Sequence, residues 1–142
     1  MVKEKQEKYD KAYLKMASTW GQLSYCERKN VGALIVKDRM IISDGFNGTP
    51  SGYKNVCEDE EHYTKWYVLH AEANAILKVA ASTQSCMGAT LYITLSPCRD
   101  CSKLIHQAGI VRVVYAKTYK DVTGLEFLKK AGVELKYVSL EN

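Results

Sequence analysis

Two short motifs in the sequence carry side chains suited to zinc chemistry. The first is His70-Ala-Glu72, and the second is Pro97-Cys-Arg-Asp-Cys101. Thiolate and imidazole are ligands that zinc prefers, and three protein ligands leave one tetrahedral position open to water. An open position is typical of catalytic zinc sites, whereas structural sites are closed by four protein ligands. The motifs therefore predict a catalytic zinc held by His70, Cys98 and Cys101.

The expected position of each motif supports one shared site. Cys98 and Cys101 lie three apart at an expected helix start, where free N–H groups and the helix dipole favour thiolate. His70 opens another expected helix. Bound Zn²⁺ lowers the pKa of its water to roughly 7, so that hydroxide forms at neutral pH. Glu72 follows His70 by two residues, and we expect it to act as the proton shuttle.

The same residues also permit a structural interpretation. A lone Cys-x-x-Cys is as typical of a zinc knuckle or a redox pair as of a catalytic site. Here a His-x-Glu motif opens the preceding expected helix, and a zinc-stabilised binding module would have no use for Glu72. A chain of 142 residues should also fold without zinc. We therefore favour the catalytic interpretation.

Composition and charge narrow the class of protein. The five cysteines are odd in number, and the first eight residues lack the apolar core of an export signal, which argues against a disulfide framework. Cys86 has no evident partner and fits a small buried apolar residue. The net charge of +4 is spread along the chain, and no apolar stretch is long enough to span a membrane. We expect a cytoplasmic enzyme that binds neither membrane nor nucleic acid.

Hydrophobic periodicity predicts alternating helices and strands. We expect a first helix that includes Tyr9 and ends near Gly21, followed by a hairpin of strands 31–36 and 40–46 and an irregular loop over 47–66. Helix 70–81, strand 90–95, helix 98–108, strand 110–115, helix 124–131 and strand 133–138 should follow. The helix between the last two strands implies that they run parallel. The expected fold is a three-layer α/β/α sandwich with a mostly parallel, mixed five-stranded sheet, in one domain over 1–142.

The chemistry-bearing motifs and three longer stretches resemble a known family. The stretches are Cys26-Glu-Arg-Lys-Asn-Val-Gly-Ala33, Ile41-Ile-Ser-Asp-Gly-Phe-Asn-Gly-Thr-Pro-Ser-Gly52 and His70-Ala-Glu-Ala-Asn-Ala-Ile76. His-x-Glu followed by Pro-Cys-x-x-Cys is the known signature of zinc deaminases. Over about 26–119 the sequence resembles deoxycytidylate (dCMP) deaminases of the cytidine deaminase superfamily, although Phe46 stands where such enzymes often carry Tyr. The resemblance implies hydrolytic deamination of dCMP to dUMP and ammonia, which supplies dUMP for thymidylate synthesis.

The resemblance also implies contacts with the nucleotide. The side chain of Asn47 would bind the 3′-hydroxyl, the N–H of Ala71 would meet the pyrimidine O2, and the carbonyl of Ser96 would accept from the amino group. Arg28 is the first candidate for the 5′-phosphate, because guanidinium matches phosphate oxygens bidentately, and Tyr119 is the second. The alternatives are a turn at Asn47 and solvated surface groups at Arg28 and Tyr119.

Regulation and assembly are expected from the resemblance alone. Many dCMP deaminases are activated by dCTP and inhibited by dTTP, with Mg²⁺ accompanying the triphosphate. In this sequence the effector site would involve Asp44, Gly45, Asn47 and Gly48, in a turn rich in backbone N–H groups. Such enzymes are commonly homohexamers, so a homo-oligomer is expected.

A second zinc is expected at Cys26, Cys57 and His62. The spacing Cys57-Glu-Asp-Glu-Glu-His62 lets one loop present both side chains, and a loop of this length is costly to order without such a link. Some phage enzymes of the family carry a second site, and these residues resemble its ligands. The fourth ligand would be one of residues 58–61 or a water. The alternative is two reduced cysteines and a surface histidine.

The nearest rival is another deaminase on the same fold, acting on tRNA adenosine, free cytidine or guanine. An RNA-acting enzyme is expected to show a basic groove with aromatic side chains around a flipped base. The pair Lys129-Lys130 is too little for such a groove. The stretch from Asn47 to Gly52 resembles that of enzymes acting on mononucleotides.

Overall fold

The computed structural model describes residues 2–141 and contains four helices and five strands within them. Their order along the chain is α1 (Val2–Gly21), β1 (Gly32–Lys37), β2 (Met40–Phe46), α2 (Ala71–Ala80), β3 (Thr90–Leu95), α3 (Arg99–Gln107), β4 (Arg112–Lys117), α4 (Thr123–Lys130) and β5 (Glu134–Tyr137). The expected order of elements is therefore confirmed.

The strands form one five-stranded sheet in the order β2-β1-β3-β4-β5. β1 pairs antiparallel with both β2 and β3, whereas β3–β4 and β4–β5 are parallel. The mixed sheet, the hairpin and the parallel last pair are as expected. The sheet is half parallel rather than mostly parallel, because β1 runs against β3.

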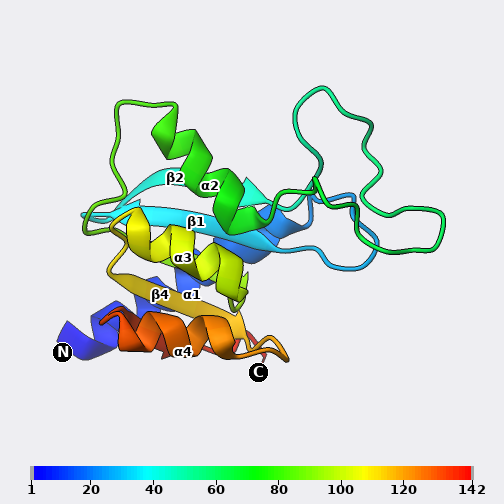
Figure 1. The fold of residues 1–142 in the computed structure, drawn as a ribbon. Helices are drawn as coiled ribbons and strands as arrows, with labels where there is room; N and C mark the ends of the chain where they lie inside the picture. Colours follow the sequence, from blue (N-terminus) through cyan, green and yellow to red (C-terminus); the bar gives the residue numbers. More distant parts are fainter. Residues whose placement is uncertain (1, 142) are drawn as a thin grey trace.

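Helices cover both faces of the sheet (Figure 1). α1 packs on one face, where Leu14 and Ala17 meet Leu34, Tyr92 and Val114. The other face carries α2, α3 and α4, whose buried side chains pack with alternate residues of the same strands. Because successive strand residues point to opposite faces, Leu34 and Ile35 of β1 enter different cores. The fold is the three-layer sandwich that the sequence predicts.

The segment between β2 and α2 is the long loop expected from its polar composition. Its regular pairing consists of isolated bridges between Gly48 and Leu69 and between Glu58 and Thr64. Figure 1 shows the loop extending away from the sheet, beyond the start of α2. It returns to the body at Leu69, directly before the first of the two chemical motifs.

β4 begins two residues later than the expected strand 110–115. Ile110 is 2 % exposed and packs in the core. It follows the turn at Gly109, whose φ of 94° favours glycine, and β4 begins only at Arg112. The buried apolar side chain of Ile110 therefore lies in the chain before the first residue of β4 that pairs in the sheet. In residues 2–141 no helix has both the length and the apolar character needed to cross a membrane.

Candidate active site

The three expected catalytic zinc ligands meet at the starts of α2 and α3. His70 is the N-cap residue of α2, and Cys98 is the N-cap residue of α3, where its Sγ accepts a hydrogen bond from the N–H of Cys101 at 3.5 Å. The Nδ1 atom of His70 lies 3.6 Å from Sγ of Cys98 and 3.4 Å from Sγ of Cys101. Zn–S bonds of about 2.3 Å and Zn–N bonds of about 2.0 Å at a tetrahedral angle would place such atoms about 3.5 Å apart. The residues therefore fit a zinc ion.

The protonation of the two thiols also suits metal binding. Hydrogen bonds with Cys101 and His70 lower the pKa of Cys98 to about 4, against the opposing effect of burial. Hydrogen bonding to Cys98 and burial raise the pKa of Cys101, and the hydrogen bond with Cys98 raises that of His70. One thiolate is thus already favoured at neutral pH, and a zinc ion would displace the remaining protons.

Glu72 lies in the first turn of α2, close to these ligands. It is 4 % exposed, and burial raises the pKa of its carboxyl group to about 7. A carboxyl group with a pKa near neutrality can both take and return a proton at the working pH. Glu72 therefore suits the role of proton shuttle that the sequence predicts.

A cavity of about 200 Å³ joins this centre to the segment before β1. Its lining includes Glu72, His70 and Cys98 at one part of the wall and the cations Arg28 and Lys29 at another. The rest of the wall is Cys26, Val31, Asn47, Glu58, Thr64, Val68, Ala71, Leu95, Ser96 and Tyr119. All five residues expected to contact the nucleotide thus line the same cavity.

Asn47 holds the segment before β1 in place. Its Oδ1 accepts from the N–H of Val31, and its Nδ2 donates to the carbonyl of Lys29, both at 2.8 Å. Asn47 therefore does more than form a turn, because its side chain joins the end of β2 to the segment before β1. A free hydrogen on Nδ2 and a second lone pair on Oδ1 are left for a ligand.

Ser96 and Ala71 lie beside the metal ligands. Ser96 is 3 % exposed, and its Oγ accepts from the N–H of Tyr119 at 2.7 Å. Ala71 is the first residue of α2, so its N–H has no partner within the helix. Both residues line the cavity into which the family resemblance expects their backbone groups to reach.

Of the four residues expected at an effector site, Gly45, Asn47 and Gly48 are buried and Asp44 is half-buried. Only Asn47 lines the cavity. Asp44 forms an ion pair with Lys78 of α2. A Cβ on Gly45 would lie 2.8 Å from the backbone nitrogen of Ala75, so Gly45 is explained by the close packing of β2 and α2.

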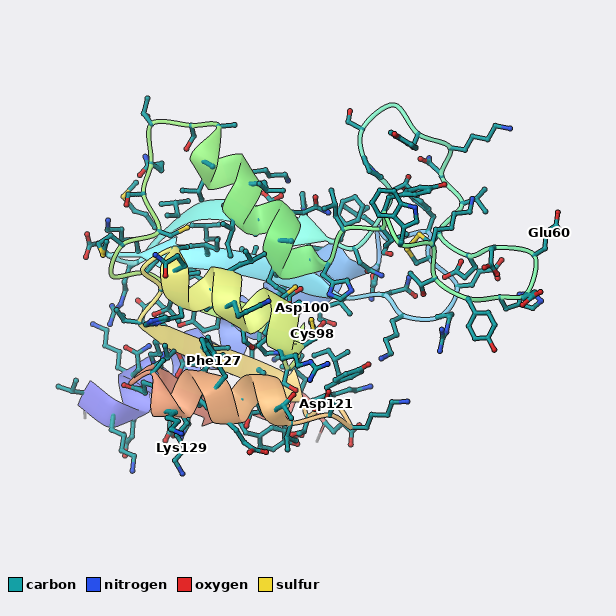
Figure 2. All side chains as sticks on the ribbon, in the orientation of Figure 1. Glu60, Cys98, Asp100, Asp121, Phe127 and Lys129 are labelled. Carbon is teal, nitrogen blue, oxygen red and sulfur yellow. A yellow bond between two sulfur atoms is a disulfide. The ribbon has the colours of Figure 1, made fainter. Side chains whose placement is uncertain are left out.

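The expected second metal cluster forms only in part. Cys26 and Cys57 are joined as a disulfide, contrary to the expectation of free or metal-bound cysteines (Figure 2). Among residues 2–141 their ligand atoms group with the carboxylate of Glu58, and His62 is not in this group. The assignment of His62 to the cluster is wrong for this structure. His62 has a φ of 67° in a turn closed by a 3.0 Å hydrogen bond from its N–H to the carbonyl of Asp59.

That turn lies in the outer part of the loop, where the side chain of His62 is exposed. Figure 2 shows Glu60, two residues earlier, at the outer end of the loop and well away from Cys98. The hydrogen bonds of Asp59 thus shape the turn.

Two residues of the site, Lys29 and Gly124, have no counterpart in the sequence-based prediction, and a third, Glu58, was predicted only as one of four candidate ligands of the second zinc. Lys29 places its Nζ 4.0 Å from the centroid of the Tyr119 ring. Glu58 is 7 % exposed and accepts from the N–H groups of Glu27 and Arg28 at 3.2–3.3 Å. Gly124 packs tightly against the turn that carries Cys98. Of these, only Lys29 had a local signal, namely a second cation directly after Arg28.

A buried glutamate beside two cysteines and a histidine on an α/β/α fold defines the class of zinc-dependent hydrolytic deaminases. Residues 6–117 match the cytidine and deoxycytidylate deaminase zinc-binding region. The chain therefore belongs to the cytidine and deoxycytidylate deaminase family.

Curated relatives and solved structures agree with this assignment. The chain is 39 % identical over 123 residues to the deoxycytidylate deaminase of Mycobacterium phage D29, covering 77 % of this chain and 94 % of that one. It is 35 % identical over 172 residues to that of Enterobacteria phage T4, covering 91 % and 89 %. The crystal structure of dCMP deaminase from the cyanophage S-TIM5 in complex with dCMP and dUMP matches with a TM-score of 0.90 and 45 % identity, over 92 % and 97 % of the chains. The cytidine deaminase-like fold is thereby confirmed.

Proposed function

We propose that the chain catalyses the reaction of dCMP with water to give dUMP and ammonia, and so supplies dUMP for thymidylate synthesis. The observation that carries the proposal is the single cavity that joins Glu72 and the metal ligands to Arg28 and Lys29. One part of its wall suits deamination of a ring, and the other offers positive charge to a phosphate. Similarity to a structure in complex with dCMP and dUMP supports this choice of substrate.

Each residue has a defined part in the proposed reaction. When bound by His70, Cys98 and Cys101, zinc supplies a water whose pKa is lowered to roughly 7. Glu72 takes a proton from the attacking water and delivers it to N3 of the cytosine ring. It then carries the second proton to the exocyclic nitrogen, which leaves C4 as ammonia.

The backbone around the ring orients the base for this reaction. The carbonyl of Ser96 accepts from the amino group, and the N–H of Ala71 donates to O2. Asn47 binds the 3′-hydroxyl with the hydrogen and lone pair that its own contacts leave free. A ribose would place its extra 2′-hydroxyl at the same wall, so CMP is expected to react more slowly.

Ammonia release from dCMP, CMP, deoxycytidine and an RNA hairpin containing adenosine or cytidine separates the candidate substrates. We expect the highest kcat/KM for dCMP. Turnover of the hairpin, or of deoxycytidine, with a higher kcat/KM than that of dCMP would overturn the proposed substrate. Absence of deamination in every zinc-replete assay would overturn the reaction itself.

We propose regulation and assembly from the family resemblance. The enzyme would be a cytoplasmic homohexamer folded as one domain per chain, activated by dCTP with Mg²⁺ and inhibited by dTTP near residues 44–48. Residues 44–48 are buried or half-buried, the N–H groups of Asn47 and Gly48 already donate to the carbonyls of Val31 and Leu69, and Gly45 has a packing role, so the proposal rests on the resemblance alone. Velocity against dCMP concentration should become sigmoidal on addition of dTTP, and the mass in solution should be six chains. A hyperbolic curve unaffected by dTTP would contradict the regulatory proposal.

We also propose that Cys26 and Cys57, once reduced, bind a second zinc together with Glu58. Cytoplasmic thiols are kept reduced, and the Cys26, Cys57 and Glu58 ligand atoms lie within 4.8 Å of one another. Reduced wild type in excess zinc should hold two ions per chain, and Cys57→Ala should hold one. Cys86→Ala is the matched control and should hold two. One zinc per reduced wild-type chain would contradict the second site.

A further inference from the structure

The half-buried Asn74 of α2 contacts two parts of the candidate site through different groups. Its backbone N–H donates to the carbonyl of the metal ligand His70 at 3.0 Å, as the first turn of the helix requires. Its side-chain Nδ2 donates to the carbonyl of Phe46, the last residue of β2, at 2.8 Å. Asn74 does not itself line the cavity, so its influence on a bound nucleotide passes through these two neighbours.

The residue after Phe46 is Asn47, which would bind the 3′-hydroxyl of the sugar in the proposed reaction. Its side chain bonds the N–H of Val31 and the carbonyl of Lys29. Its own carbonyl accepts from the hydroxyl of Ser24 at 2.8 Å. These bonds fix Asn47 relative to the chain before β1, whereas the metal ligand and the proton shuttle belong to the start of α2.

The backbone on either side of Asn47 is joined to the region where α2 begins. Gly48 pairs with Leu69 through two backbone hydrogen bonds of 3.1 and 2.8 Å. On the other side, Phe46 accepts the bond from the side chain of Asn74. The first link is made by backbone atoms and the second by a side chain. The second link therefore depends on which residue stands at position 74.

Other contacts hold α2 against β2 before the strand reaches Phe46. Oγ of Ser43 donates to the carbonyl of Ala75 at 2.7 Å. A Cβ on Gly45 would lie 2.8 Å from the backbone nitrogen of Ala75, so the strand and the helix are in close contact there. Because these contacts do not involve the side chain of Asn74, its loss should shift only the end of β2 and leave the two elements packed together.

We propose that Asn74 is a positioning residue that holds the sugar-binding Asn47 in register with the zinc site. In this role it contributes to the selection of substrates that carry a 3′-hydroxyl. Reacting groups tolerate little displacement, and a misplacement of about 1 Å can lower a rate about 100-fold. The inference rests on the proposed reaction of dCMP and on the proposed contact of Asn47 with the sugar.

The test compares dCMP with 2′,3′-dideoxycytidine 5′-monophosphate, which lacks the 3′-hydroxyl and cannot use the contact with Asn47. Asn74→Leu keeps the branching of the side chain and removes its N–H donor without adding a charge. Since one positioned hydrogen bond is lost, kcat/KM for dCMP should fall by about 10-fold, and that for the dideoxynucleotide should change little. The preference of wild type for dCMP should therefore shrink in the variant.

Ser43→Ala is the matched control. It also removes a hydrogen bond from a side chain to the backbone between β2 and α2, and Ser43 does not line the cavity. It should keep the wild-type preference for dCMP, whatever it loses in unfolding temperature. Zinc content should equal that of wild type in both variants. The inhibition constants of dUMP and of its dideoxy analogue measure the same preference without turnover.

Two results with Asn74→Leu would overturn the positioning role and leave the deaminase proposal intact, namely equal losses on the two substrates or no loss on dCMP. The same change of preference in Ser43→Ala would do so as well. A wild type that does not prefer dCMP to the dideoxynucleotide would also overturn it, because Asn47 would then not bind the hydroxyl. A wild type that does not deaminate dCMP would instead overturn the proposed function. Asn74→Ala replaces the leucine variant if that variant does not fold.

Discussion

Glu72 is the residue on which the proposed chemistry depends most. Glu72→Gln keeps the shape of the side chain and removes its ability to exchange a proton. We expect kcat to fall by about 10²–10⁴-fold, because positioned proton transfer contributes on that order. Zinc content and unfolding temperature should be close to those of wild type, since Glu72 is not among the grouped ligands. Metal analysis together with ammonia release checks the prediction, and kcat within threefold of wild type would contradict it.

The metal ligands should behave differently from the glutamate. Cys101→Ser replaces a buried thiol that lies 3.4 Å from Nδ1 of His70, and should lose both zinc and activity. The buried Cys86 is the control, because Cys86→Ala removes a thiol outside the site. Full zinc content in the Cys101 variant would show that the ligand assignment is mistaken.

At the scale of residues, the sequence predicted those site residues that lie in a recognisable short motif. His70, Cys98 and Cys101 lie at the starts of two helices, in short motifs whose spacing could be recognised in the sequence. Glu58 could not be singled out in this way, because the acidic residues in the run Cys57-Glu-Asp-Glu-Glu-His62 share the same local pattern. Only the folded loop buries it against the N–H groups of Glu27 and Arg28. His62 was misplaced for the same reason, since sequence spacing does not show the turn that Asp59 forms.

The elements that position the site were predictable because their apolar periodicity is strong. Helices and strands were predicted in type and order, and β2 and β3 also in their bounds. The pairing of β1 with β3 was not predictable, because no local pattern records which strand lies beside another across 50 residues or more of chain. That antiparallel pair sets how the hairpin meets the parallel half of the sheet.

One contact between elements, α4 against the turn of Pro97 and Cys98, supports the metal site directly. A Cβ on Gly124 would lie 2.6 Å from Oγ of Ser102 and 2.8 Å from the carbonyl carbon of Cys98, and would also meet the carbonyl of Pro97. These are mostly backbone atoms of the metal-binding turn, so α4 or the turn must shift. α3 and α4 also pack through His106 and Phe127, whose ring centroids are 6.0 Å apart. Figure 2 shows Phe127 between the two helices.

Gly124→Ala should therefore destabilise the fold by about 1–3 kcal/mol and weaken zinc binding at the same time. Lys129→Ala is the control, since Lys129 is exposed on the same helix. Thermal unfolding and competition for zinc with a chelator measure the two effects. If the alanine variant lost stability but kept wild-type zinc affinity, α4 would not be supporting the metal site.

At the scale of the whole molecule, a buried ion pair joins the first helix to the far half of the sheet. Asp10 of α1 is 1 % exposed and accepts two hydrogen bonds from Arg112 of β4, at 2.8 and 2.7 Å. Tyr92 of β3 donates to the same carboxylate at 2.7 Å, and Arg112 also donates to Glu134 of β5 at 2.6 Å. Residues 102 positions apart thus meet in one network, which periodicity could not reveal because a buried Asp looks like a surface residue of the helix.

The last prediction concerns how this network depends on pH. Burial alone would raise the pKa of Asp10, but hydrogen bonds from Arg112, Tyr92 and Gln6 hold it below its ordinary value of 3.8. A carboxylate whose pKa is lower in the folded state stabilises that state above the unfolded pKa, and this stabilisation is lost as pH falls through the folded pKa. Asp10→Asn should therefore lower the free energy of unfolding at pH 7 by about 3 kcal/mol, because it removes the buried one of the two carboxylates that pair with Arg112. The difference from wild type should shrink as pH falls below about 4, where the unfolded state begins to bind a proton at Asp10, and it should disappear only below the lower pKa of the folded state. Urea unfolding from pH 7 to 3 measures it, with Glu7→Gln, an exposed acid of the same helix, as the control. A difference between wild type and Asp10→Asn that stays constant over this range would show that the charge of Asp10 does not stabilise the fold.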